Sequence, residues 1–295
     1  MTKNDIRKII DEARQGFVLV QFESRCYLPR RKDDAATLEA AKKNGVTPED
    51  ITVMKDTVAD ARITKIIQIR DRARKYHYMV TRPWAGRRVG VLRGQDLLGY
   101  CQEMNAMKKE FYSAVNDAAE IWPEIVADQA ERLNGLFRLE DYPSQAEFKG
   151  RFDLGYYIDQ LPVKGDWLLD IPEDAVEELA GSFEEQMQDR LDSLKKSVLS
   201  EASGVFKKVQ ASLKDKKRGK HKRITDALIK SVTETAGWLA DLNIDNDQDI
   251  NTILSTIAEH MPGAEDIRTS DDKLDTAIDT MSVAINSVAK VRSKS

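Results

Sequence analysis

The chain has 295 residues, of which 41% are hydrophobic, 33% charged and 7% aromatic, and its formal net charge is −4. This length allows one or two domains with a real core, whereas two cysteines exclude a disulfide-built secreted scaffold and three histidines leave little for a zinc or iron site. No apolar run approaches the ~18 residues of a membrane span, so we expect a soluble, cytoplasmic protein.

Two stretches of the N-terminal half are expected to form β-structure. The first is FVLVQFESRCYLP, Phe17–Pro29, which is rich in β-branched and aromatic residues. The second is Arg82–Gly94, where Pro83 and Gly86 mark a turn between two β-prone runs and so predict a hairpin. We expect both stretches to pair into one small sheet.

The first long helix is predicted from about residue 48 to residue 80. Thr47 can cap it, Pro48 suits its first turn because proline has no N–H to leave unpaired, and Glu49 and Asp50 suit its positive end. Apolar residues then recur with a period close to 3.6 as far as Val80.

The helical period returns from Gln95 to Trp122, and Pro123 is expected to kink or restart the helix before a second leg that reaches Leu136. A turn over Asp141–Ser144 is followed by a short capped helix at Gln145–Phe152. The proline-marked stretch 161–172 is expected to be a connection. It divides the chain into an N-terminal α+β domain, 1–160, and a C-terminal helical domain, 173–295.

The C-terminal half is predicted to be nearly all helix. An apolar stripe from Val176 to Leu213 indicates one very long amphipathic helix, and segments 224–242, 249–261 and 271–291 supply partners with the same period. The fold class is therefore mainly α. Long amphipathic helices form an elongated antiparallel bundle or helical hairpin, and a small β-hairpin or sheet lies in the N-terminal half.

The near-neutral total conceals segregated charge. The segment from Arg62 to Arg93 contains ten Lys/Arg and one Asp, and the segment from Lys207 to Arg223 contains nine and one. By contrast, the segment from Asp241 to Asp279 holds eleven acids and two bases. Such blocks either pair with each other, within or between subunits, or meet an outside polyanion.

The hairpin supplies the first group of candidate binding residues for nucleic acid or a protein partner. Guanidinium groups neutralise phosphates, and an exposed indole can stack on a base. The alternative is that these arginines pair with acidic helices and that the tryptophan belongs to the core. The candidates are Arg82, Trp84, Arg87, Arg88 and Arg93.

The second group lies in KDKKRGKHKR, which contains a glycine and no apolar residue and is expected to be an exposed loop between helices. Such a loop binds nucleic acid or an acidic protein surface, or is only a solvated turn. The candidates are Lys214, Lys216, Lys217, Arg218, Lys220, Lys222 and Arg223.

Catalytic, cofactor and metal motifs are missing from the sequence. The glycines of GRRVGVLRG fit neither a P-loop nor a dinucleotide fingerprint. The segment from Asp241 to Thr252 imitates the start of a calcium loop but has Asn246 and Thr252 where Gly and Glu are needed, so we interpret it as a helix-capping turn. We therefore predict no catalytic residue, no metal and no cofactor, and we interpret Cys26 and Cys101 as structural.

The order of these features resembles the domain-of-unknown-function family 3150 of phages, plasmids and integrative elements. The resemblance rests on DYPS, Asp141–Ser144, followed by Phe148, Phe152 and Leu161–Pro162, and on the very long helix that comes next. It implies an accessory protein encoded near a chelatase-like AAA+ ATPase, a von Willebrand-type partner and recombination genes. It supplies no functional residues.

Three functions remain open from the sequence. The first is a non-catalytic phage or mobile-element protein that self-assembles through its long helices and docks on a protein partner, either the AAA+ ATPase complex or a host factor. The second is a DNA- or RNA-binding accessory factor in replication or recombination that uses the Arg/Lys clusters. The third is an enzyme without a recognisable motif.

Overall fold

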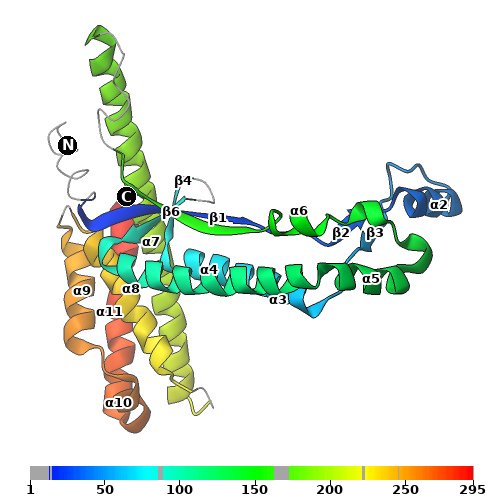
Figure 1. Ribbon diagram of the computed structural model, residues 1–295. Helices are drawn as coiled ribbons and strands as arrows, with labels where there is room; N and C mark the ends of the chain where they lie inside the picture. Colours follow the sequence, from blue (N-terminus) through cyan, green and yellow to red (C-terminus); the bar gives the residue numbers. More distant parts are fainter. Residues whose placement is uncertain are drawn as a thin grey trace. The chain divides into compact units, whose positions relative to one another are not determined.

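The computed structural model describes residues 13, 15–85, 89–162, 173–220, 223–244 and 246–294. Within them the chain forms ten α-helices and six β-strands, which agrees with the predicted, mainly α class (Figure 1). The backbone makes two compact units. The first comprises Met1–Val20, Thr81–Leu97 and Ile158–Ser295, and the second comprises Gln21–Val80 and Leu98–Tyr157. The predicted division at 161–172 lies mostly outside the described residues and stays a prediction.

A four-stranded antiparallel sheet has the order β4-β5-β1-β6. The predicted hairpin is confirmed as β4, Arg82–Ala85, and β5, Val89–Arg93, and its predicted neighbour is β1, Phe17–Arg25. Gly90 is required in β5, because a Cβ there would lie 2.6 Å from the Thr81 hydroxyl oxygen. The fourth strand, β6, Asp153–Gln160, was not predicted.

The second unit is built on long helices and a two-stranded ladder. Its helices are α2, Asp34–Asn44; α3, Ala61–Val80; α4, Leu97–Glu120, which begins one residue before the unit; α5, Trp122–Leu133; and α6, Gln145–Lys149. Its ladder pairs β2, Arg30–Lys32, with β3, Met54–Asp56. Pro123 restarts the helix as predicted, and Ser144 caps α6 through a capping box with Glu147.

The predicted start of the first long helix is wrong. Residues 48–50 form a turn, in which Thr47 donates its hydroxyl to Asp50 at 2.6 Å, and the helix begins only at Ala61, behind Asp60. The reason is tertiary. Lys55 belongs to β3, and its ammonium group is buried between Asp141 at 2.8 Å and Asp33 at 3.4 Å. Those contacts override the local helix signal.

The first unit contains the predicted helical bundle. Its helices are α7, Glu173–Lys217; α8, Asp226–Asp241; α9, Gln248–His260; α10, Ala264–Thr269; and α11, Asp271–Lys294. The apolar stripe of α7 is buried from Met187 to Leu213, with Val205 half-buried, because α8 and α11 pack against it. The earlier members of the stripe, Val176, Leu179 and Phe183, lie outside the described side chains.

Candidate nucleic-acid interface

The hairpin cations of the first unit lie against a tryptophan of the bundle. The guanidinium of Arg82 is 4.7 Å from the ring centroid of Trp238, and that of Arg93 is 5.3 Å from it. Phe17 stacks on the same indole at 5.9 Å between ring centroids. A cation over an aromatic face is attracted by the ring quadrupole, so this cluster fixes the hairpin on α8.

Both arginines also pair with carboxylates. Arg82 Nε lies 2.6 Å from Glu201, and Arg93 lies 2.7 Å from Asp96 and 3.6 Å from Asp241. Burial lowers the pKa of Arg82 and raises the pKa of Asp241. These cations are therefore engaged within the unit.

Trp84 belongs to the core. Its side chain is 8% exposed, and Arg190 of α7 lies 5.9 Å from its ring centroid. The indole of Trp84 is therefore not exposed for stacking on a base. The alternative, in which the tryptophan belongs to the core and the arginines are paired, agrees with the environments of Trp84, Arg82 and Arg93. Arg87 and Arg88 lie outside the described residues.

The end of α7 presents a different set of cations. Lys207 and Lys214 recur at i and i+7 on one exposed face of α7. Arg218, the first residue after the helix, continues this face at i+11, because its backbone N–H still donates to the Lys214 carbonyl oxygen at 3.1 Å, and Lys208 is exposed beside them. Arg223 is exposed after the turn. None of these five side chains makes an ion pair with another residue that the structure describes. Lys222 lies outside the described residues.

Three cations of the same segment are occupied instead. Lys216 donates to the backbone oxygen of Arg268 at 3.1 Å, Lys217 pairs with Asp275, and Lys220 pairs with Asp215 at 3.1 Å. The loop predicted for this basic segment is wrong over residues 214–217, because they form the last turn of α7, and only a short turn follows them. The basic side chains divide into engaged and unengaged ones.

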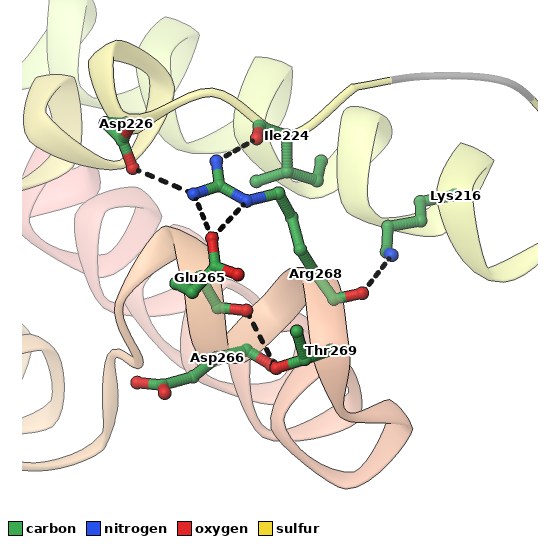
Figure 2. A network of polar contacts seen from close by, with 7 residues as sticks. All are labelled: Lys216, Ile224, Asp226, Glu265, Asp266, Arg268 and Thr269. Carbon is green, nitrogen blue, oxygen red and sulfur yellow. Dashed lines mark hydrogen bonds and ion pairs between the residues drawn. The ribbon is translucent and has the colours of Figure 1, made fainter.

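Arg268 braces the chain where it leaves this turn (Figure 2). Its guanidinium donates to the backbone oxygen of Ile224 at 2.9 Å and pairs with Glu265 at 2.6 Å and Asp226 at 3.4 Å. The contact from Lys216 to the Arg268 backbone ties α7 to the same corner. Sequence reasoning missed Arg268, since it is an isolated cation in an acidic segment.

A pocket of about 400 Å³ opens beside the unengaged cations. It lies between the end of α7 and the first turns of α11, and donors line one wall while carboxylates line the other. The lining residues are Lys214, Lys217, Arg218, Asp275, Ile278 and Asp279.

Among the described residues, no group of three or more His, Cys, Asp or Glu side chains could hold a metal ion. The calcium-like segment includes Asp245, which is outside those residues, while its Asp247 caps α9 by accepting the backbone N–H of Asp249 at 2.8 Å. No helix in the described part of the chain is long and apolar enough to cross a membrane.

Comparison with known proteins adds no relative. No protein-family model matches the chain, and neither does a curated protein or a solved structure. The resemblance to family 3150 therefore stays a prediction that rests on the quoted residues.

Proposed function

We propose that the protein is a non-catalytic nucleic-acid-binding protein that contacts the sugar-phosphate backbone with the end of α7. The observation that carries this proposal is the set of five exposed cations without an ion pair in the described structure. They are Lys207, Lys208, Lys214, Arg218 and Arg223. This role suits an accessory protein of a phage or mobile element, the context that the resemblance implies.

The spacing of these cations matches a phosphate backbone. Lys207 and Arg218 are separated by roughly 17 Å along the helix, a length over which one strand of a duplex carries about five phosphates. Because these cations have no ion-pair partner among the described residues, binding would release counterions without first breaking an ion pair of the described structure. Backbone contacts of this kind do not read sequence.

The test is the salt dependence of binding, measured by fluorescence anisotropy with short DNA and RNA strands between about 50 and 200 mM salt. We expect the logarithm of the affinity to fall linearly with the logarithm of the salt concentration. In the variant Lys207→Gln/Lys214→Gln/Arg218→Gln the slope should become shallower by roughly 2 to 3, since each lost phosphate contact removes about 0.7 to 0.9.

The matched control is Lys216→Gln/Lys217→Gln/Lys220→Gln, which removes the same charge from the same segment but takes away cations that are already engaged. The loss of three positive charges should lower the affinity of this control as well, but the slope of its salt dependence should stay close to that of the unmodified protein. Absence of binding at low salt, or an equal change of slope in both variants, would overturn the proposal.

A second candidate function is self-assembly together with docking on a protein partner, such as an AAA+ ATPase or a host protein. It is favoured by exposed apolar side chains in the second unit. Twelve large apolar side chains are exposed in the described structure, and six of them lie in the segments 28–54 and 136–139 of this unit. Lys55 connects these two parts of the chain, because its ammonium group contacts Asp141 and the backbone oxygen of Leu136. The six side chains are Leu28, Leu38, Val46, Met54, Leu136 and Leu139.

Self-association through this surface can be separated from nucleic-acid binding. Light scattering after size exclusion should give an oligomer for the unmodified protein and a monomer for Leu136→Ser/Leu139→Ser. The substitution Leu98→Ser, at an exposed leucine of the same unit outside these segments, is the control. A monomer of the unmodified protein at high concentration would remove self-association from this candidate function.

A further inference from the structure

The pocket beside the basic end of α7 has an ordered distribution of polar groups. Lys214 and Arg218 stand on the α7 side without an ion pair to any described residue, and Lys217 shares its charge with Asp275. On the α11 side, Asp279 has no hydrogen-bond donor or cation among the residues that the structure describes, and Ile278 supplies an apolar surface.

This arrangement matches the parts of one nucleotide. A phosphate takes charge-assisted hydrogen bonds from lysine and arginine, a sugar covers an apolar side chain, and a carboxylate accepts a hydrogen bond from a ribose hydroxyl, as in dinucleotide sites. The volume of about 400 Å³ lies within the range of small-ligand sites, roughly 300 to 1,000 Å³.

The carboxylate distinguishes between two kinds of nucleic acid. The 2′-hydroxyl is a donor that RNA has and DNA lacks. When a DNA strand occupies the same position, Asp279 must approach the backbone without a donor to satisfy it, and its charge then repels the phosphates.

We propose that the pocket receives one nucleotide of the bound strand, with its phosphate on Lys214 and Arg218 and its 2′-hydroxyl on Asp279, so that the protein prefers RNA to DNA. This inference rests on the proposed function, because the rest of the strand lies on the α7 cations. The ligand class is single-stranded RNA.

The test compares the affinities of the full chain for single strands of the same sequence made of RNA, DNA and 2′-O-methylated RNA. The unmodified protein should bind RNA about tenfold more tightly than either of the others, the size expected for one hydrogen bond to a charged group. Asp279→Asn should bring this ratio down to roughly two or less. The ratio cancels the general gain in affinity that removal of a negative charge produces.

Asp272→Asn is the control, since Asp272 is an exposed carboxylate of the same helix that does not line the pocket, and it should leave the RNA preference unchanged. Equal affinities of the unmodified protein for the three strands, with salt-dependent binding retained, would overturn this inference and leave the proposed function in place. If the unmodified protein showed no salt-dependent binding to any of the three strands, the proposed function itself would be overturned.

Discussion

Some basic side chains of this protein are enclosed and paired with carboxylates, whereas those at the end of α7 are exposed. Lys55 in the second unit and Arg82 and Arg93 in the first are held away from water, with 6%, 12% and 12% of their side chains exposed, and each has carboxylate partners. At the end of α7, Lys207, Lys214 and Arg218 are exposed and without ion pairs in the described structure.

A basic run in the sequence does not by itself mark a binding surface. Burying a charge costs several kcal/mol unless a partner compensates it. Each enclosed cation here is therefore needed, together with its carboxylate partners, for the stability of the fold. An exposed cation costs little and is worth little to folding. Substitutions should therefore separate the two sets, with stability affected by the first and binding by the second.

The largest effect is expected at Lys55. Burial alone lowers the pKa of its ammonium group, but the carboxylates of Asp141 and Asp33 raise it above its usual value. In Lys55→Met these two carboxylates lose their cation inside the protein, and the free energy of unfolding of the second unit should fall by about 3 to 5 kcal/mol. Urea unfolding followed by hydrogen exchange of peptides from that unit measures this.

Lys32→Met is the matched control for Lys55, since Lys32 lies in the paired strand β2 with 51% of its side chain exposed and pairs with Asp34. Its loss should cost less than about 1 kcal/mol. Similar losses for the two variants would contradict the interpretation of Lys55 as an enclosed structural cation.

A second effect concerns His77, a buried basic side chain that is held neutral. Burial lowers its pKa from 6.5 to about 4. Since the unfolded chain takes up a proton at a higher pH than the folded one, stability should be lost as the pH falls from about 6.5 to 4, by at most ~3 kcal/mol.

The measurement is the urea midpoint at several pH values in that window, with His77→Gln as the comparison. Glutamine still offers a neutral hydrogen-bonding group to the Tyr100 hydroxyl, which lies 2.9 Å from His77 Nδ1, but does not titrate. Its stability should change less with pH, and parallel pH profiles of the two proteins would rule out the role of His77.

A smaller effect is expected where the guanidinium of Arg93 packs against Gly237 of α8. A Cβ on Gly237 would lie 2.6 Å from Arg93 Nη1, so Gly237→Ala must move the guanidinium away from Trp238. In an Arg93→Ala background that clash is absent, and alanine should stabilise the helix by about 1 kcal/mol over glycine. The double-mutant cycle should give a coupling energy of about 1 kcal/mol.

Gly204→Ala in α7 serves as the control for this cycle, because a Cβ at that position meets nothing within 4 Å. It should stabilise the protein equally with and without Arg93. Additive effects of Gly237→Ala and Arg93→Ala would show that the guanidinium does not occupy the described position.

The smallest effect on stability is expected at the end of α7. Lys207→Gln/Lys214→Gln/Arg218→Gln should change the free energy of unfolding by less than about 0.5 kcal/mol per site, although we expect the same variant to change the salt slope of binding. A loss of several kcal/mol, measured by urea unfolding, would place these cations with the structural set.

Much of the helical architecture could be predicted, because its signals are local. The stripe of α7 repeats without interruption, and Pro123 and Ser144 mark helix starts that need no tertiary partner. By contrast, α2 was missed because only Thr37 and Ala41 of its residues are buried, which leaves almost no apolar period. The strand β6 was missed because only Leu154 among its residues is fully buried, so that alternation is weak.

The site was predicted in part. The basic segment after Leu213 is visible in the sequence, but the difference between Lys214 and Lys216 is not. These two residues are separated by two positions, and their environments differ because Arg268 of α10 presents its backbone oxygen to only one of them. Such a contact depends on how distant helices pack, which composition and spacing do not encode.

The interleaved order of the two units along the chain has a consequence for synthesis. The second unit, Gln21–Val80 and Leu98–Tyr157, has been synthesised in full before the first residue of α7 is made, whereas the first unit waits for its last helix. Compact units form as their residues emerge. All residues of the second unit are therefore available to fold before the helices that pack against α7 have been made.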